Sequence, residues 1–400
     1  MILSIVIPAL NEEDSIASII ERTLAASPVI IKNTDVSEVE ITVVSDGSTD
    51  DTVKIAQNYL PNINLIILEK NKGYGAAIKK GWEESKGELL AFLDADGTCD
   101  PLFFENLCTL LKRENADVVL GCRLNKESKM PLIRRVGNFI FATLLSILSS
   151  SKVKDTASGM RVIRKSSLKH LYPLPDGLHF TPAMSARCLL NKELVISEEN
   201  MSYNEREGES KLSVSKDGVR FLKVILKTAI LYRPQIIINI LAVFMIIIGC
   251  AIIYSPLLHY FYFGKIDDWM LYRLVFSNVL GVFSLVLFST SFLLQNAVYL
   301  SLTTDVQNIK FDGFNFKFFN SKISLFVGVL LIIVGFSLVS ESILDRISTG
   351  HTNEHWSRYI VFSFCEISGL VILVTRSFKK IFALLIDRLS FVQSEYYKKI

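Results

Sequence analysis

The sequence lacks several features that would assign it to a familiar class of protein. Its six cysteines lie far apart and form no CxxC pair, so we expect no zinc site and a reducing compartment. The formal net charge is only +3, and no strongly basic segment is large enough to form a domain, so we expect no nucleic-acid partner. The five histidines show no metal-ligand spacing, and we interpret them as structural.

The first half of the chain also lacks long hydrophobic runs, whereas the second half is dominated by them. Residues 234–264 and 274–304 carry no charge, residues 323–340 form a third uncharged run, and residues 359–375 form a fourth that only Glu366 interrupts. A helix needs about 20 apolar residues to cross a bilayer, with about 17 as the lower end. The sequence therefore predicts four membrane spans, and a carboxylate within the last of them is expected to face the protein interior.

Basic residues predict how these spans are oriented. Four spans return the chain to the side from which it started. The loop between the second and third spans carries Lys310, Lys317 and Lys322, and the tail is also rich in Lys and Arg, whereas the opposite loops hold fewer basic residues. Cytoplasmic loops carry an excess of Lys and Arg. We therefore expect an integral, multi-pass membrane protein whose N-terminal domain and C-terminus are cytoplasmic. Packing of spans between copies of the chain, as a homo-oligomer, stays open.

The first half alternates short apolar runs with amphipathic helical stretches. The runs have the length and the nearly continuous apolar character of strands that are buried on both faces of a parallel sheet. They are Ile2–Ile7, Glu40–Val44, Leu65–Leu68, Leu89–Leu93 and Val118–Leu120. The first run lacks a basic start, so we expect a strand there and not a signal peptide. The pattern predicts an α/β fold with a mostly parallel, Rossmann-like sheet, followed by an all-α transmembrane domain.

Four parts are expected along the chain. They are an α/β domain at 1–212, an amphipathic interface helix at 213–232, a four-helix transmembrane domain at 233–376 and a basic amphipathic tail at 377–400. The interface helix is expected because basic residues recur at helical spacing beside apolar ones, which is typical of a helix that lies on a lipid surface. These basic residues are Lys216, Arg220, Lys223 and Lys227. Arg134–Leu148 has a similar pattern, and an ordinary surface helix is the alternative for both segments.

A polar cluster follows each predicted strand. The clusters are Asn11-Glu12-Glu13, Asp46-Gly47-Ser48, Lys70-Asn71-Lys72-Gly73, Asp94-Ala95-Asp96 and Gly121-Cys122-Arg123. In open parallel sheets, ligands bind outside the carboxyl ends of the strands. Since the five clusters are expected to meet at this edge of the sheet, the edge is the candidate site.

Asp94 and Asp96 give the sharpest chemical signal. They end the apolar run LLAFLD, and residues i and i+2 of an extended chain point to the same side. Two such carboxylates can hold one Mg²⁺ or Mn²⁺ ion, which would neutralise the charge on a diphosphate leaving group. A solvated turn is the alternative. The nearby Gly73-Tyr74-Gly75 falls short of a dinucleotide fingerprint because Ile78 stands where the third glycine should be, so a dehydrogenase is excluded.

Taken in order, the segments of the N-terminal half resemble glycosyltransferase family 2, which has the GT-A fold. Within that family they are most similar to the dolichyl- or polyprenyl-phosphate sugar synthases. The matching segments are SIVIPALNEE (4–13), ITVVSDGSTDDT (41–52), NKGYGAA (71–77), LLAFLDADG (89–97), GCR (121–123), DTASGMRV (155–162) and YNEREGESKL (203–212). The four spans resemble the membrane part of some phosphodolichol mannose synthases and of small GtrA-like proteins.

The resemblance implies a role for each matching position. The nucleotide would be bound by Pro8, Leu10, Glu12, Asp46, Lys72 and Asp94. The metal ion would be bound by Asp94 and Asp96. The acceptor phosphate would be bound by Arg123, Arg134 and Asn138. Catalysis would involve Asp94 and Asp96 together with Asp155 and Arg161, which with Ser158 would face the donor sugar. A loop containing Arg206, Ser210 and Lys211 would close over the diphosphate.

The resulting hypothesis is an inverting glycosyltransferase that moves a hexose from a GDP- or UDP-sugar to a polyprenyl or dolichyl phosphate at a bilayer. An acceptor phosphate is already anionic near neutral pH, so the site needs positioning and charge neutralisation more than a strong base. Arginine suits this task because its planar fork binds phosphate through two hydrogen bonds. The sequence does not identify the sugar, the nucleotide or the lipid.

Two other functions are weighed against this hypothesis. A processive family 2 polysaccharide synthase would carry a QxxRW motif, but none of Trp82, Trp269 and Trp356 follows an arginine in that pattern. A non-catalytic lipid-carrier transporter or partner protein would not need Asp94, Asp96 and Arg123 to be intact. Both alternatives are therefore less consistent with the residues present.

Overall fold

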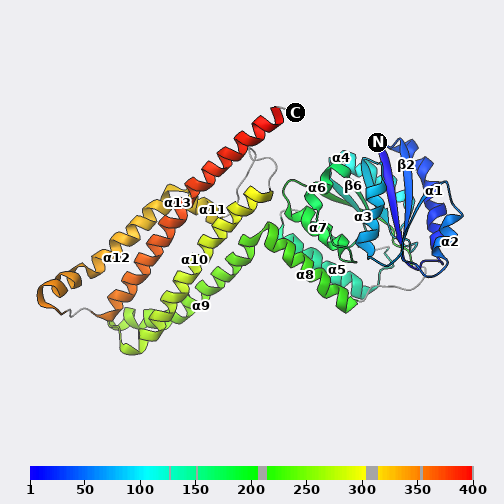
Figure 1. Ribbon diagram of the computed structural model, residues 1–400. Coiled ribbons are helices and arrows are strands. Elements are labelled where there is room, and N and C mark those ends of the chain that lie inside the picture. Colours follow the sequence, from blue (N-terminus) through cyan, green and yellow to red (C-terminus); the bar gives the residue numbers. More distant parts are fainter. Residues whose placement is uncertain (126–127, 150–151, 206–213, 303–313, 352–354, 399–400) are drawn as a thin grey trace. The chain divides into compact units, whose positions relative to one another are not determined.

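The computed structural model describes residues 1–125, 128–149, 152–205, 214–302, 314–351 and 355–398. The chain divides into two compact units, Met1–Tyr232 and Arg233–Ile400, which are described one at a time (Figure 1).

The first unit is built on a seven-stranded sheet with the order β3-β2-β1-β4-β6-β5-β7. The strands are β1 (Ile2–Ala9), β2 (Glu38–Asp46), β3 (Asn64–Leu68), β4 (Leu89–Leu93), β5 (Val118–Cys122), β6 (Met160–Arg164) and β7 (Ile196–Asn200). Every neighbouring pair is parallel except those of β6, which runs antiparallel to β4 and to β5. The predicted α/β fold with a mostly parallel sheet is confirmed, and β1 to β5 correspond to the five predicted strands.

Helices cover both faces of this sheet. In β4, Leu89 and Leu93 join one apolar core and Phe92 joins the other, because successive side chains of a strand point to opposite faces. The first core also contains buried residues of α1 (Ile16–Asn33) and α4 (Phe104–Arg113), and the second contains those of α3 (Tyr74–Glu84) and α7 (Phe180–Leu190). The short helices of this unit are α2 (Thr52–Gln57), η1 (Pro101–Phe103), η2 (Lys165–Ser167) and α6 (Leu168–Leu171).

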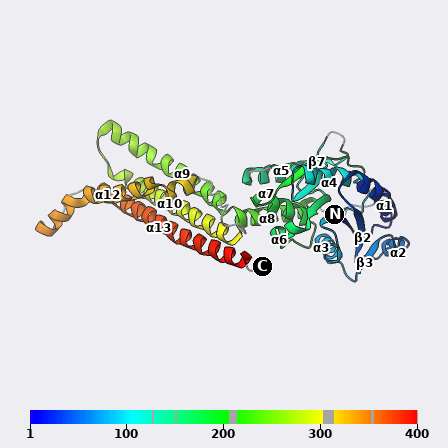
Figure 2. The ribbon, with the colours of Figure 1, turned by 90° about the horizontal axis from the view of Figure 1, so that it is seen from above.

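Two longer helices, α5 (Leu132–Leu148) and α8 (Val214–Tyr232), lie side by side in the first unit (Figures 1 and 2). The rings of Phe141 and Phe221 meet edge to face between them, with centroids 5.9 Å apart. On each helix a buried stripe faces the rest of the unit, and a second stripe of large apolar side chains is exposed. The exposed residues are Leu132, Ile133, Val136, Phe139, Ile140 and Ile147 of α5 and Val219, Leu222, Leu226, Ile230 and Leu231 of α8.

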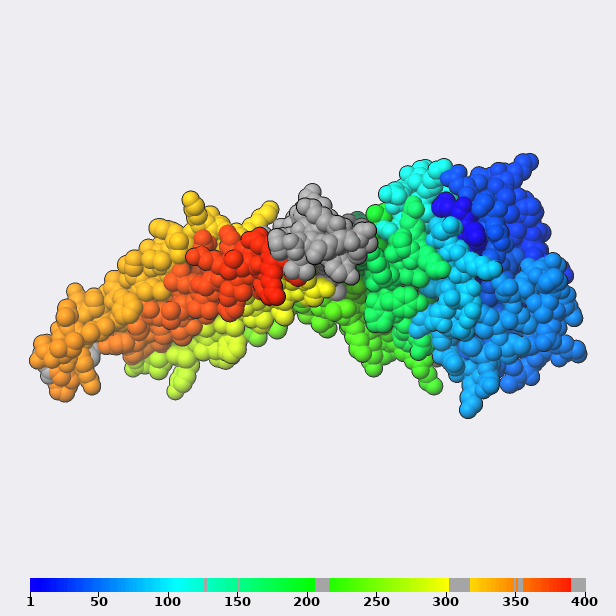
Figure 3. Space-filling view, turned by 45° about the horizontal axis from the view of Figure 1, so that its top comes forward, coloured from blue at the N-terminus to red at the C-terminus, as the bar shows by residue number. Residues whose placement is uncertain are grey.

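The second unit consists of helices. They are α9 (Pro234–Phe263), η3 (Asp268–Met270), α10 (Leu271–Leu302), α11 (Phe314–Asn320), α12 (Lys322–Thr349) and α13 (Trp356–Lys398). Helix α9 packs along α10, and α12 packs along α13, as Figure 3 shows for the orange and red helices. Within the part of the chain that the structure describes, four helices are long and apolar enough to cross a membrane, namely Pro234–Phe263, Asp268–Ser301, Lys322–Ser348 and Trp356–Leu389. The chain therefore has the character of a multi-pass membrane protein.

Polar contacts join the helices of the second unit. Ser277 donates to the Gly249 carbonyl at 3.1 Å, and Asn278 donates to the Ile360 carbonyl at 2.9 Å. Glu366 lies against α12, where Gly335 leaves room for its carboxylate. Helix α13 crosses residue 376 without a break, so the tail expected at 377–400 continues the last helix as far as Lys398. The reason is local, since residues 377–398 contain no proline or glycine that would end a helix.

Candidate functional site

Asp94 and Asp96 lie directly after β4, at the carboxyl edge of the sheet. Asp94 is half-buried, and its Oδ1 accepts a hydrogen bond of 2.6 Å from the Tyr74 hydroxyl. Asp96 is 7% exposed, and its Oδ1 accepts from the Thr98 hydroxyl at 2.6 Å and from the Thr98 amide at 3.2 Å. Neutral donors thus hold one oxygen of each carboxylate in a defined direction.

Gly159, the residue directly before β6, contacts Asp94. The Asp94 amide donates to the Gly159 carbonyl at 3.2 Å. A Cβ at position 159 would lie only 1.7 Å from Asp94 Oδ2, so only glycine leaves room for the carboxylate. The segment DTASGMRV and the Asp94-Ala95-Asp96 cluster, which are more than 50 residues apart in the sequence, therefore form one local structure.

Tyr203 links the carboxylates to a basic side chain. The Arg123 guanidinium lies over the Tyr203 ring, 5.5 Å from its centroid. Burial raises the pKa of Tyr203; the charge of Arg123 opposes this shift, and the charges of Asp96 and Asp94 add to it. Gly159 contacts Asp94, and the adjacent Ser158 contacts Gly121, which lies two residues before Arg123, so the acidic and basic parts of the candidate site are close together.

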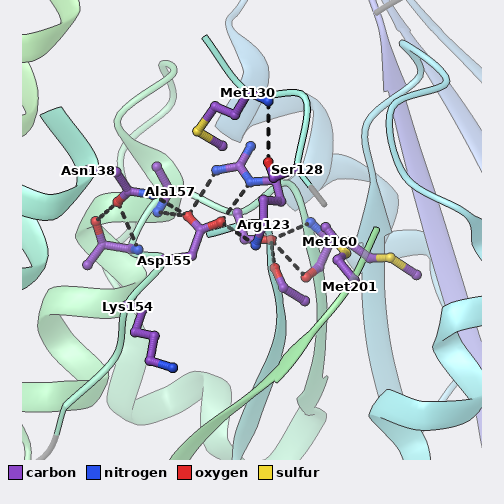
Figure 4. A network of polar contacts seen from close by, with 12 residues as sticks. Arg123, Ser128, Met130, Asn138, Lys154, Asp155, Ala157, Met160 and Met201 are labelled. Atoms are coloured by element: carbon purple, nitrogen blue, oxygen red, sulfur yellow. Dashed lines mark hydrogen bonds and ion pairs between the residues drawn. The ribbon is translucent and has the colours of Figure 1, made fainter. Parts of the chain in front are cut away.

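The Arg123 guanidinium forms a two-pronged ion pair with Asp155 (Figure 4). Its Nε donates to Oδ2 at 2.8 Å, its Nη2 donates to Oδ1 at 3.0 Å, and its own amide donates to Oδ2 at 3.0 Å. The Asn138 side chain of α5 donates a further hydrogen bond to Asp155, at Oδ1 and 2.6 Å. The residues predicted to receive a phosphate, Arg123 and Asn138, thus meet at a carboxylate that was predicted to face the sugar.

The charges of this pair stabilise each other. Burial by itself would raise the pKa of Asp155, but the charge and hydrogen bonds of Arg123 outweigh burial and hold that pKa below its usual value. Burial likewise opposes the charge on Arg123, and Asp155 raises the pKa of the guanidinium above its usual range. Both groups are therefore ionised at neutral pH. Arginine carries five N–H donors, and the structure shows two of those in Arg123 directed to Asp155.

Ser158 and Arg161 are fully buried, so neither presents its side chain to solvent. The Ser158 hydroxyl donates to the Gly121 carbonyl at 2.6 Å. Arg161 donates to the carbonyls of Ser158 at 3.1 Å and Thr156 at 2.9 Å, and burial lowers its pKa to about 10. In the structure both side chains shape the loop that holds Asp155, and their role toward the donor sugar stays a prediction.

The residues predicted for the nucleotide are spread along the same edge. Pro8 is buried at the end of β1, and Leu10 and Glu12 follow it as half-buried residues. Asp46 is also buried, and its two oxygens accept the amide hydrogens of Lys72 and Gly73 at 2.7 and 2.8 Å. The observed contact of Asp46 therefore fixes the turn before α3, and the Lys72 side chain is exposed beside it.

Arg134 is half-buried in the first turn of α5, and Arg206, Ser210 and Lys211 lie outside the described residues. Tyr74, Thr98 and Tyr203 were not predicted, although each belongs to or adjoins a segment that the sequence analysis singled out. The hydroxyl of Thr98, two residues after Asp96, is a local signal that could have identified it, since hydroxyls bind nearby carboxylates at turns.

The carboxylates suit a hard divalent cation. Within the described ranges, no group of three or more His, Cys, Asp or Glu side chains could enclose a metal ion. Mg²⁺ is usually bound by one or two carboxylates together with substrate phosphates and water, so the pair of Asp94 and Asp96 fits a metal that arrives with a diphosphate. A closed structural zinc site, by contrast, would need four protein ligands.

Two open grooves lie among the described helices of the second unit, with volumes of about 430 and 540 Å³. The first lies between α10 and α13 and includes Asn278 and Ser363, and the second lies between α9 and α10 and includes Arg273. Their other lining residues are almost all apolar, and no carboxylate is among them. They are therefore less suited to phosphate chemistry than the edge of the sheet.

Comparison with known proteins assigns a family to the N-terminal part. Residues 4–172 match the family described as Glycosyl transferase family 2. The low-salt glycan biosynthesis hexosyltransferase Agl6 of Haloferax volcanii is 34% identical over 57% of this chain, and the dodecaprenyl-phosphate galacturonate synthase of Rhizobium johnstonii is 27% identical over 54%. The alignments span 54% and 62% of those two proteins. The dolichyl-phosphate β-glucosyltransferase ALG5A of Trichomonas vaginalis is 29% identical over 58% of this chain and 74% of its own length.

Proposed function

The chain belongs to glycosyltransferase family 2, and we propose that it transfers a hexose from a nucleotide-sugar to a polyprenyl or dolichyl phosphate. One observation carries the proposal: Asp94 and Asp96 directly follow β4 and Arg123 directly follows β5, so acidic and basic groups meet at the same carboxyl edge of the sheet. Relatives named for dodecaprenyl and dolichyl phosphates support this class of acceptor. The sugars in their names differ, so the hexose and the choice of UDP or GDP stay open.

Asp94 and Asp96 would hold Mg²⁺ or Mn²⁺ together with the donor diphosphate. The cation, when bound, would neutralise the charge that develops on the nucleoside diphosphate as it leaves. The two side chains are suited to this role because Tyr74 and Thr98 each fix one carboxylate. Pro8, Leu10 and Glu12 would line the base and ribose pocket.

Arg123 would bind and orient the acceptor phosphate. A phosphate monoester is largely dianionic at neutral pH because its second pKa is about 6, so no side chain has to remove a proton. One of its oxygens forms the bond to the anomeric carbon while the bond from that carbon to the diphosphate oxygen breaks. The electron pair leaves with the nucleoside diphosphate, and the configuration of the sugar inverts. Asp155 and Asn138 would keep Arg123 in place for this step.

We further propose that α5 and α8 rest on the surface of a lipid bilayer. Their exposed stripes contain some of the most exposed apolar side chains of the first unit, among them Leu132 at 75% and Phe139 at 67%. The exposed basic residues Lys216, Lys223 and Lys227 stand beside the stripe of α8 and suit anionic headgroups. Only Arg233 separates the end of α8 from the start of α9, so the chain runs directly from α8 into the first predicted span. A bilayer surface would bring the acceptor phosphate to the level of Arg123.

The excess of Lys and Arg in the loop between the second and third spans and in the tail supports a cytoplasmic first unit. The direct test incubates membranes that contain the protein with polyprenyl phosphate and a panel of radiolabelled UDP- and GDP-sugars. Label in an organic-soluble, mild-acid-labile product is the expected result for one donor. A long polymer would point instead to a polysaccharide synthase. Failure of every donor to transfer label would refute the proposal.

A further inference from the structure

A hydrogen bond joins the Tyr74 hydroxyl, at the start of α3, to the Asp94 carboxylate, directly after β4. The O–H donates to Oδ1 at 2.6 Å. The rest of the tyrosine ring is surrounded by apolar groups, since Phe92 and Phe180 both meet it edge to face with centroids 6.4 Å away. Packing thus fixes the ring, and the hydroxyl is directed at a carboxylate that we assign to the cation.

The backbone that carries Tyr74 is also fixed. Asp46 accepts the amide hydrogens of Lys72 and Gly73, the two residues before it. Gly73 has a φ of 107°, and a Cβ there would lie 2.6 Å from the Asp176 carbonyl oxygen, so this turn requires glycine. Tyr74 therefore projects from a turn that is held from both sides, which is how a rigid support positions a functional group.

The Tyr74 hydroxyl acts as a donor, because the carboxylate of Asp94 offers only acceptor atoms and its Oδ1 lies 2.6 Å away. Asp94 is constrained on its other side by Gly159, whose missing side chain admits the carboxylate. The carboxylate thus lies between a hydroxyl donor and a glycine, and rotation about its χ angles is limited.

We infer that Tyr74 is a positioning residue, whose hydroxyl holds the Asp94 carboxylate in the orientation that binds a divalent cation carried by a nucleoside diphosphate. The inference rests on the proposed function and extends it to a residue outside the acidic pair. Removal of the hydroxyl leaves the charge of Asp94 unchanged but allows the carboxylate to adopt other orientations. A hydrogen bond to a charged group is strong enough for this loss to weaken cation binding by about 10-fold or more.

The test compares two tyrosine-to-phenylalanine variants of the full chain in detergent. Tyr74→Phe removes the hydroxyl that contacts Asp94. Tyr59→Phe is the matched control, because its hydroxyl also donates to a carboxylate, that of Glu21 at 2.7 Å, but on the exposed surface and not to Asp94 or Asp96. Binding of Mn²⁺ is titrated by electron paramagnetic resonance with UDP and, separately, with GDP. The melting temperature of each metal-free protein reports folding, and titrations are run well below it.

We expect Tyr74→Phe to raise the Mn²⁺ dissociation constant about 10-fold, while Tyr59→Phe leaves it unchanged. Transfer by Tyr74→Phe should then be restored in part at high Mn²⁺ concentration, which a general loss of structure would not produce. Equal Mn²⁺ binding by Tyr74→Phe and the wild-type chain would overturn the inference while leaving the proposed function intact. Failure of the wild-type chain to bind Mn²⁺ with either nucleotide would overturn this inference and the metal assignment together.

Discussion

Arg123 and Asp155 form an ion pair through two parallel hydrogen bonds, at 2.8 and 3.0 Å, at the edge of the sheet. Asp155 is fully buried, and Arg123 is nearly so, with 12% of its side chain exposed. The geometry explains why arginine stands at position 123, since lysine has no planar fork that could match both carboxylate oxygens. The pair also ties the end of β5 to the loop before β6, so one interaction connects two parts of the candidate site.

Asp155→Ala should destabilise the first unit by about 3–5 kcal/mol, because it leaves the buried guanidinium of Arg123 without its partner. Thermal unfolding of the purified protein, followed through the first unit, measures the effect. Asp35→Ala is the control, since Asp35 pairs with Lys112 on the exposed surface. Surface pairs contribute little, so the control should melt close to the wild-type chain. Equal melting of both variants would contradict the structural role of the buried pair.

Arg123→Lys should separate the two substrates of the proposed reaction. Lysine keeps a positive charge beside Asp155 but loses the second hydrogen bond of the fork, so the acceptor phosphate should be held less well. We expect the acceptor KM to rise about 10-fold, with a smaller change in the donor KM. Arg113→Lys serves as control, because Arg113 pairs with Glu114 on the exposed surface. An unchanged acceptor KM in Arg123→Lys would remove Arg123 from the acceptor site.

The architecture was largely predictable from the sequence, because burial on both faces gives parallel strands a nearly continuous apolar character. The antiparallel strand β6 was not predicted, although its five residues MRVIR lie between β4 and β5. Two arginines interrupt its apolar pattern, and only the structure shows that Arg161 is buried with its Nε and Nη2 donating to backbone carbonyls. The strand β7 has the sequence ISEEN and lies at the edge of the sheet. It was not predicted either, because its acidic residues interrupt the apolar pattern.

The edge of the sheet at which the candidate residues lie was predictable, but the contacts of these residues were not. Asp46 and Arg123 were expected because they follow predicted strands, and Asp155 because the segment DTASGMRV resembles the family. Contacts between segments that are distant in the sequence decide what each group touches, so the amides of Lys72 and Gly73 at Asp46 could not be foreseen. A hydrogen bond between distant residues leaves no periodic pattern in the sequence. Such contacts become visible only when the fold brings the two segments together.

Asp96→Ala should abolish metal-dependent transfer without preventing folding or membrane insertion. The proposed cation supplies several kcal/mol of charge stabilisation, so a loss of about 100-fold or more in kcat/KM is expected. Transfer assays over a range of Mg²⁺ and Mn²⁺ concentrations measure it. Asp100→Ala is a useful comparison, because Asp100 caps the short helix η1 and its carboxylate is exposed. Full activity of Asp96→Ala would refute the metal assignment.

His179 should make the first unit less stable as the pH falls. Burial, followed by the charge of Arg220, lowers the pKa of His179 below its usual value of 6.5. As the pH falls, the His179 ring therefore becomes protonated in the unfolded chain before it becomes protonated in the folded chain. Stability contributed by the neutral ring is complete above pH 6.5 and declines as the pH falls below that value toward the lowered pKa.

His179→Asn should remove this part of the pH dependence. Unfolding of both proteins, measured between about pH 7.5 and 5, should give a smaller loss of stability for the variant than for the wild-type chain. Arg220→Gln should act in the same direction, since it removes the positive charge that disfavours protonation of the ring. Parallel pH curves for the wild-type chain and His179→Asn would show that another group is responsible.

The exposed stripes of α5 and α8 should matter only where a bilayer is present. Replacement of Lys216, Lys223 and Lys227 by Gln should lower transfer in anionic vesicles more than in neutral detergent, because polybasic segments are attracted to anionic lipids by about 1 kcal/mol per residue. Arg220 is left unchanged, since it donates to the buried Asp217.

Phe139→Gln should also lower transfer in vesicles, because it removes an exposed apolar side chain from α5. Ile67→Gln is the control, because Ile67 is also exposed but lies in β3. Salt should reduce the difference between the triple variant and the wild-type chain in vesicles but leave the effect of Phe139→Gln. Equal losses in vesicles and detergent would place these residues in folding or catalysis, and the lipid-bound face would have to be abandoned.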